Sequence, residues 1–208
     1  MTEEKPKEVV PEVSEKEREE FNEKENALLK EINELRTNPK AYAEKIEKNK
    51  QYFDDKKVYR NPEDKAGVRT EEGAEAYDEA IDFLKNKAVP VEALTRSKGL
   101  NKLAFDILTE YQKDMDAQLD LDTLIPKYGK YVGAYRQVTQ FGSNRPEQII
   151  INLVVSDGDK TRGQRDALLE ATLKQAGVAF GKHEKFRYLT VVTGCTKFEN
   201  TIDPDDTA

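Results

Sequence analysis

Cysteine, histidine and tryptophan are nearly absent from the chain. Among its 208 residues there are one cysteine, one histidine and no tryptophan. The single cysteine, Cys195, excludes an intramolecular disulfide. The single histidine, His183, cannot by itself form a metal cluster. No apolar run approaches the roughly 18 residues that a membrane span needs, so we expect no transmembrane helix.

Charge is abundant but unevenly distributed. Residues 1–26 carry ten Glu against four Lys and one Arg, and residues 198–208 carry four acidic side chains. Because the whole chain has a net charge of −7, the segment between these ends is close to +2. A protein that binds nucleic acid shows a clustered basic surface, so we expect no nucleic-acid partner. This distribution predicts an acidic tail at 1–20, one domain at 21–197 and a second acidic tail at 198–208.

The amino terminus lacks the pattern of a secretory signal. Residues 1–14 carry charges throughout and have no apolar core of seven residues or more. Disulfides are typical of secreted domains, and this chain cannot form one within itself. We therefore expect a soluble cytoplasmic protein, with a secreted chain whose signal has been removed as the alternative.

Apolar spacing predicts four helices in the first half of the chain. The first starts near Ser14 or Glu19 and buries Leu28, Ile32 and Leu35, which are spaced by four and three residues. Asn38 followed by Pro39 is typical of the cap and first position of a second helix. Two further helices are expected at 74–84 and 97–111, with a polar loop at 49–70 between the second and third.

The second half combines an irregular segment with two strands. Residues 119–135 contain Pro126, Gly129 and Gly133 and are expected to be irregular. Two strands, 177–180 and 188–193, should close the domain, with 181–185 as a polar hairpin turn.

Short motifs in the second half occur in an order typical of one family. They are Phe141-Gly142-Ser143-Asn144, Asp157-Gly158, Gly163-Gln164-Arg165, Gly177-Val178-Ala179 and the run from Val191 to Cys195. With Arg36-Thr37-Asn38-Pro39 near the start, they resemble an SCP-like domain of the CAP superfamily over residues 27–197. That superfamily includes cysteine-rich secretory proteins, venom antigens and plant pathogenesis-related proteins.

The resemblance implies an α-β-α sandwich, an α/β fold with an antiparallel sheet between helical layers. It also bears on residues 147–155, which are rich in β-branched side chains and favour a strand by propensity. Pro146 before this segment and Asp157-Gly158 after it favour a buried helix. The family has a helix here, so we expect a helix.

The resemblance implies a cleft lined by two histidines and two acidic residues, which bind a divalent metal in some members. Here the glutamate position falls on Gln137 and one histidine position on Gln164, while Asp157 matches the other acid. The remaining histidine should lie within 113–120, where there is none. One carboxylate with two amides cannot hold zinc, and neither amide titrates near neutral pH. We therefore expect no metal, no cofactor and no enzymatic activity.

Other reactive side chains have ordinary structural interpretations. We expect His183 in the hairpin turn, Cys195 packed in or beside the sheet, and Ser143 as a turn or capping residue. Ser156 has no histidine base placed by sequence near it. Asp157 is expected to cap the buried helix or pair with Arg162 or Arg165, and the acidic residues 114–122 to form a solvated loop without the glycine and glutamate of a calcium loop.

Aromatic side chains are frequent where the cleft is expected, namely Tyr128, Tyr131, Tyr135 and Phe141. They either fill the cleft or form a partner-binding surface, since tyrosine is favoured at interfaces. The first hypothesis is a non-enzymatic protein-binding or structural module, with a cytoskeletal or ciliary assembly as a setting. The second is a domain that binds a lipid, a sterol or another small ligand. A residual hydrolase is a third and requires a metal or nucleophile that the sequence does not supply.

Overall fold

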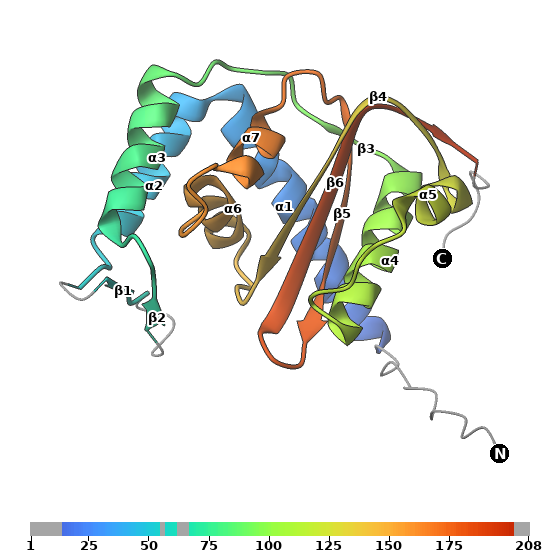
Figure 1. Cartoon of the computed structure of the whole chain (residues 1–208), viewed down its shortest axis with the longest axis horizontal. Coiled ribbons are helices and arrows are strands. Elements are labelled where there is room, and N and C mark those ends of the chain that lie inside the picture. The colour runs from blue at the N-terminus through green and yellow to red at the C-terminus, as the bar shows by residue number, and fades with distance from the viewer. Residues whose placement is uncertain (1–13, 55–56, 62–66, 202–208) are drawn as a thin grey trace.

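A four-stranded sheet lies at the centre of the molecule, with the strand order β3-β5-β6-β4 (Figure 1). The computed structural model describes residues 14–54, 57–61 and 67–201. The strands are β3 (Thr95–Arg96), β4 (Gly129–Phe141), β5 (Gln175–His183) and β6 (Arg187–Asn200). β5, β6 and β4 are antiparallel neighbours, whereas β3 runs parallel to β5. The sheet is therefore mixed and not antiparallel throughout, which corrects the expectation.

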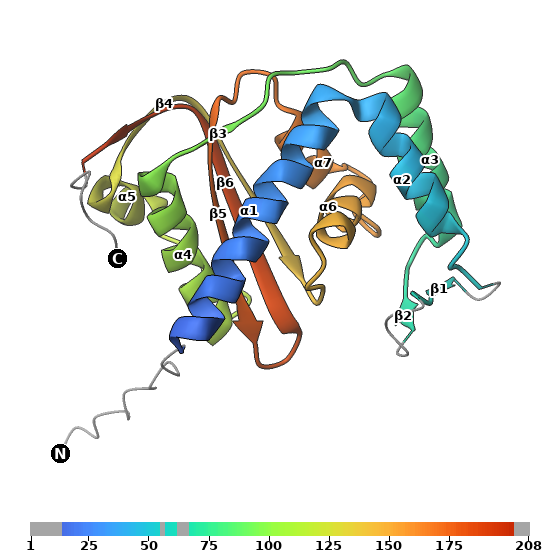
Figure 2. The same cartoon turned by 180° about the vertical axis from the view of Figure 1, so that it is seen from behind.

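Helices cover both faces of this sheet. α4 (Lys98–Lys113) packs on one face, and α1 (Glu15–Thr37) and α6 (Pro146–Val155) pack on the other (Figures 1 and 2). α7 (Gly163–Leu169) also contacts β4, and the layer continues away from the sheet through α2 (Pro39–Lys50) and α3 (Ala74–Asn86). The chain thus has an α/β fold in three layers.

Alternation along the strands divides the interior into two cores. Leu189 and Val191 of β6 pack in the core formed with α4, whereas Val192 packs in the core formed with α1 and α6. In β5, Ala179 belongs to the α4 core, and Val178 belongs to the other. Successive strand residues point to opposite faces, so one sheet supports both cores.

Helix starts in the first half of the chain follow the predicted caps. Ser14 and Glu17 form a reciprocal capping box at the start of α1, and the Asn38 side chain accepts from the Ala41 amide at 3.2 Å at the start of α2. Ser97 likewise caps α4. Because α1 begins at Glu15, its first turns lie inside the segment 1–20 that was expected to be a tail. Residues 1–13 and 202–208 of the expected tails lie outside the described residues.

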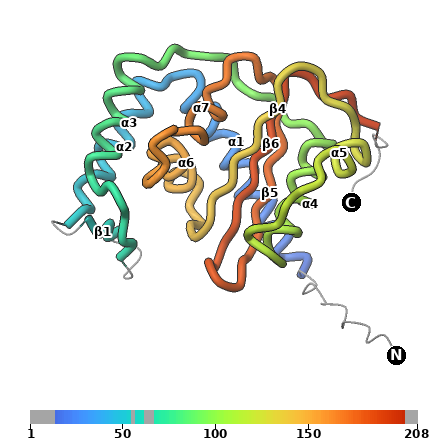
Figure 3. The backbone as a smooth tube through the Cα atoms, in the orientation of Figure 1, coloured from blue at the N-terminus to red at the C-terminus, as the bar shows by residue number. Residues whose placement is uncertain are grey.

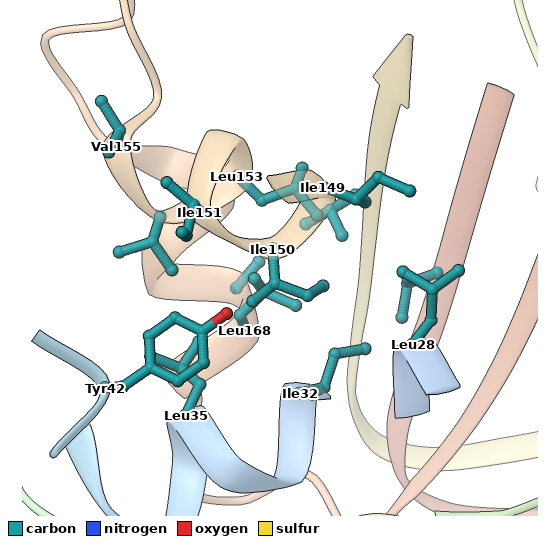
Figure 4. Close-up of a cluster of buried hydrophobic side chains, with 14 of the residues drawn as sticks. Leu28, Ile32, Leu35, Tyr42, Ile149, Ile150, Ile151, Leu153, Val155 and Leu168 are labelled. Carbon is teal, nitrogen blue, oxygen red and sulfur yellow. The ribbon is translucent and has the colours of Figure 1, made fainter. Parts of the chain in front are cut away.

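The predicted helix at 147–155 is confirmed as α6, with Pro146 at its first position and Ser156 in the left-handed conformation at its end. Its apolar side chains are buried on every side, because α6 lies between α1, α3, α7 and β4. Figure 4 shows Ile150 of α6 near Leu35 and Tyr42 in this core. Burial on all sides explains why the segment shows neither a two-residue nor a clear helical period.

The expectation of an irregular segment at 119–135 is wrong for its second half. Gly129 begins β4, which follows β6 for most of its length (Figure 3). Glycine is required there because a Cβ on Gly129 would lie 2.5 Å from the Phe198 ring. Gly133 has φ +81° within the irregularity between Val132 and Tyr135. These glycines fit the strand against its neighbour and do not end it.

Other parts of the chain also differ from expectation. Before β4, α5 (Leu121–Leu124) and the short 3₁₀ helix η1 (Ile125–Lys127) follow α4. The loop expected at 49–70 contains a small hairpin, β1 (Val58–Tyr59) with β2 (Val68–Arg69). The β5–β6 turn is residues 184–186, not 181–185, and β6 extends the sheet into the expected carboxyl-terminal tail as far as Asn200.

Candidate functional site

Gln137 lies near the middle of β4, opposite Thr193 of β6. Its side-chain amide donates to the Tyr111 hydroxyl of α4 at 3.3 Å, and the Tyr135 hydroxyl donates to its oxygen at 3.4 Å. Burial raises the pKa of Tyr135 well above its ordinary value, so this phenol stays neutral. The amide therefore joins two phenols on the α4 side of the sheet.

Gln164 approaches the same strand from its free edge. It lies in the first turn of α7, and its side-chain oxygen accepts from the Thr139 amide of β4 at 3.2 Å. β4 is an edge strand, and its outward amides have no strand partner among the described residues. Gln164 supplies one of the missing acceptors, two residues along β4 from Gln137.

Asp157 serves a different part of the fold. Its two carboxylate oxygens accept from the backbone amides of Glu71 and Glu72 at 2.8 and 2.9 Å, just before α3. The expectation that Asp157 pairs with Arg162 or Arg165, or caps α6, is thus wrong. Two consecutive backbone amides just before a helix provide a donor for each oxygen of the carboxylate.

The two arginines pair with acidic residues of the α3 region instead. Arg162 contacts both carboxylate oxygens of Glu72 at 2.7 and 2.8 Å, and Arg165 contacts both of Glu79 at 2.8 Å. The Arg162 hydrogen bonds lower the pKa of Glu72 to about 2. Arg162 adopts a left-handed conformation with φ 55°, which this pairing helps to hold. These contacts fasten α7 to α3.

The three predicted cleft positions therefore do not converge on one point. Gln137 donates to Tyr111 of α4, Gln164 accepts from the edge of β4, and Asp157 accepts from the amides just before α3. Within 14–54, 57–61 and 67–201, no group of three His, Cys, Asp or Glu side chains is placed to hold a metal ion.

The predicted aromatics separate into three places along β4 and the segment before it. Tyr128 donates to the Asp106 carboxylate at 2.7 Å, and the Tyr131 and Tyr135 rings lie 5.4 Å apart. At the far end, Phe141 contacts the His183 ring at 5.3 Å. These four side chains therefore do not gather at one place in the fold. Tyr128, Tyr135 and Phe141 pack against the α4 core, whereas Tyr131 is 40% exposed.

His183 and Cys195 have structural surroundings. His183 is the last residue of β5, and its Nδ1 accepts from the amides of Lys185 and Phe186, both at 3.2 Å. Cys195 is buried in β6 beside Gln175, at the opposite end of β5, and burial raises the pKa of its thiol to about 11. The histidine and the cysteine are therefore too far apart to act as a base and nucleophile.

The serines and the acidic loop are also engaged locally. The Ser143 hydroxyl accepts from the Arg145 amide at 3.3 Å, which confirms the turn interpretation. Ser156 donates to the Leu153 carbonyl at 2.9 Å. Asp120 caps α5, and Asp114 accepts from the Asp116 amide.

Two surface hollows are lined by other residues. One has a volume of about 570 Å³ and is lined by Lys57, Arg69, Thr70 and Glu71 beside the β1–β2 hairpin. The other, of about 440 Å³, lies between the end of α1 and the segment around Pro90. Neither is lined by a predicted cleft or aromatic residue.

The burial of two charged residues of α1 was not predicted from the sequence. Arg36 is fully buried, and Glu25 of α1 is largely buried, with 13% of its side chain exposed. Their spacing indicates that both lie on the apolar face of α1, because Glu25 is four residues after Phe21 and Arg36 is four residues after Ile32. A charged residue at a stripe position has to find partners inside the fold.

Comparison with known proteins assigns neither family nor function. No protein-family model and no curated protein matches the chain. Among solved structures, an outer surface protein from Borrelia burgdorferi is similar with a TM-score of 0.43 and 13% identity, covering 51% of this chain and 80% of that one. At this TM-score the likeness carries no argument about fold or function. Among the described helices, none combines the length and apolar character needed to cross a bilayer.

Proposed function

We propose that this protein is a non-enzymatic SCP-like domain that acts as a protein-binding module. The motif order in the sequence supports the family, and the α/β fold in three layers is compatible with it. The observation that carries the functional part is the use of Gln137, Gln164 and Asp157 as hydrogen-bonding partners for the protein's own strands and helices.

The chemistry of these positions supports a binding role over a catalytic one. A general acid or base must titrate near the working pH, and a glutamine amide does not. A zinc site needs imidazole, thiolate or carboxylate ligands held around one point. Here two positions are amides and the one carboxylate is bonded to two backbone amides elsewhere. Gln137, Gln164 and Asp157 stabilise the fold, so we place the binding function on the exposed surface.

The surface we propose for the partner is the start of β4. Tyr131 and Val132 are 40% and 47% exposed, and the Tyr131 ring rests on that of Tyr135. A tyrosine held by a second ring presents a large contact area with little entropy to lose on binding. An intracellular assembly, such as a cytoskeletal or ciliary one, is the proposed setting.

Site-specific photo-crosslinking tests this proposal. A photoreactive phenylalanine analogue replaces Tyr131 in cells that contain the native partners, and the matched control carries it at Val89, which is 68% exposed. We expect one or a few discrete protein adducts from position 131 and none of these from position 89. Identical adducts from both positions, or no adduct from position 131, would overturn the proposed surface.

Measuring the metal content of the protein distinguishes a protein-binding module from a residual metal-dependent enzyme. We expect the purified protein to contain no stoichiometric transition metal, because the amides cannot replace imidazole and carboxylate ligands. Emission spectroscopy after mild purification measures this directly. One zinc or copper per chain would contradict the non-enzymatic part of the proposal, whatever the crosslinking result.

Binding of a lipid or another small ligand is the second proposal and has less support. The larger hollow is lined by two cations, a carboxylate and a threonine, which do not match an acyl chain or a sterol. Native mass spectrometry of the same preparation decides this point. A co-purified lipid of constant mass would favour the second proposal over the first.

A further inference from the structure

The two halves of α1 are held in different ways. Its carboxyl-terminal half buries Leu28, Ile32 and Leu35 in the core with α6. The amino-terminal half, residues 15–25, instead lies along β5. This half is the part of α1 that extends past α6 across the sheet (Figure 2).

Three contacts join this half to β5. The Glu17 carboxylate pairs with Lys182, and the Phe21 ring meets the Phe180 ring edge-on at 5.5 Å. The Glu25 side chain accepts from the Phe180 backbone amide at 3.2 Å. Two of the three contacts therefore converge on Phe180.

Phe180 lies where the sheet has a free edge. β3 pairs with β5 only at Gln175 and Ala176, so within the described part of the chain every second amide further along β5 points outward without a strand partner, while the amides between them face β6. Glu25 satisfies one of them, and its carboxylate does so from a largely buried position. An unpaired strand edge readily adds another strand, so α1 here covers a reactive surface.

The groups that face Glu25 set its charge. Arg96 of β3 lies 3.7 Å from the Glu25 carboxylate, and Lys182 of β5 is already paired with Glu17. α4 contributes neutral amides to this edge, since Asn101 accepts from Val178 and Gln112 donates to Lys182. Burial raises the pKa of Glu25 to about 7, although the Phe180 amide and Arg96 act in the opposite direction.

We propose that residues 15–25 of α1 form a proton-controlled strap over the β5 edge, held when Glu25 is neutral and loosened when Glu25 is ionised. When the strap opens, the Glu25 carboxylate moves from a largely buried site into water. Opening is then favoured at high pH, because the ionised carboxylate is better solvated in the open form.

The direction and size of the effect follow from linkage. The closed strap binds the proton with a pKa of about 7, whereas Glu25 in the open strap has the ordinary pKa of 4.5. Closure is therefore strongest below pH 4.5 and weakens as the pH rises through about 7. Between pH 6 and pH 8 the opening equilibrium should increase by about tenfold.

Hydrogen exchange at pH 6 and pH 8 tests the strap in the full chain. Protection factors, corrected for intrinsic exchange, are compared for residues 15–25 and for the Phe180 amide, with α6 as an internal reference. We expect about a tenfold loss of protection in the strap and at Phe180 from pH 6 to pH 8. Protection that does not change with pH would overturn the proposal.

Two variants separate Glu25 from the other contacts. Glu25→Gln keeps an acceptor for the Phe180 amide but cannot ionise, so its protection should be the same at both pH values. Glu17→Gln is the matched control, because Glu17, whose pKa is lowered by Lys182, is ionised at both. It should weaken the strap while keeping the tenfold pH response. A pH response in Glu25→Gln equal to that of the wild type would contradict the proposal.

A measurement without variants keeps the proposal testable if Glu25→Gln fails to fold. The carbon chemical shift of the Glu25 carboxyl and the proton shift of the Phe180 amide are followed from pH 4 to pH 9 in the wild type. We expect both to change together with a midpoint near 7. Separate midpoints, or a Glu25 midpoint below pH 5, would overturn the proposal.

Discussion

Arg36 shows how one buried charge can hold distant segments together. Its guanidinium donates to the backbone carbonyls of Glu92, Leu168, Glu170 and Leu173. Burial lowers its pKa, yet these carbonyls compensate the charge in place of a carboxylate. The end of α1 is thereby fastened to the segment before β3 and to the α7–β5 connection.

The same residue explains the Arg-x-Asn-Pro motif in physical terms. Arg36 binds the carbonyls, Asn38 caps α2, and Pro39 occupies the first position of that helix. The motif thus combines a side chain that bonds to distant backbone carbonyls with a cap and a proline that start the next helix.

Replacing Arg36 should destabilise the protein strongly. Arg36→Met leaves buried carbonyls without their donor, and we expect the free energy of unfolding to fall by about 3 kcal/mol or more. Urea denaturation followed by circular dichroism measures the change. Arg18→Met on the exposed face of α1 is the matched control and should stay within about 0.5 kcal/mol of the wild type. Equal effects of the two substitutions would contradict the assigned role of Arg36.

At the scale of elements, side chains seal the strand edges that no neighbouring strand covers in the described part of the chain. Gln164 binds the β4 edge at Thr139, and Asn101 and Glu25 bind the β5 edge at Val178 and Phe180. Covering an edge in this way opposes edge-to-edge association of copies. Gln164 therefore stabilises the edge of β4, a role that the Gly163-Gln164-Arg165 motif does not indicate.

α6 packs against α1, α3, α7 and β4, and its apolar side chains are buried. Ile150 is fully buried between α6 and the helices around it (Figure 4). We expect Ile150→Ala to lower the free energy of unfolding by about 2–5 kcal/mol, because it leaves a cavity in a closely packed core. Chemical denaturation measures this. Val89→Ala, at a side chain that is 68% exposed, is the control and should change little. A cost near zero for Ile150→Ala would mean that α6 is not packed as described.

At the scale of the whole molecule, one sheet separates two cores and connects them. Strand residues alternate between the core with α4 and the core with α1 and α6. Loss of one core removes the packing on one whole face of the sheet, which leaves every strand less firmly held. The two cores should therefore unfold together.

This cooperativity can be measured with one substitution in each core. Ile150→Ala in one and Leu103→Ala in the other should each lower the midpoint of the same single thermal transition, because both cores rest on the same strands. Far-ultraviolet and near-ultraviolet circular dichroism report secondary structure and aromatic packing. Coincident transitions are expected for the wild type and both variants. A variant that shows two separated transitions would contradict a single cooperative unit.

Local signals in the sequence determined much of the element order. Ser14, Asn38 and Ser97 predict helix starts because a short polar side chain at these positions satisfies free amides. Pro146 and Asp157-Gly158 favour a helix that ends between them, although the β-branched composition of 147–155 favours a strand. The β5–β6 pair follows from β-branched residues around a polar turn. Each of these interactions forms within a few residues, so the sequence by itself is enough.

Only the tertiary structure decided what depends on distant neighbours. Gly129 and Gly133 look like breaks until β6 is beside them, and Asp157 finds its partners 86 and 85 residues away. The burial of Glu25 likewise depends on the β5 edge. A side chain's charge and partners follow from what the fold brings next to it, and sequence spacing does not contain that information.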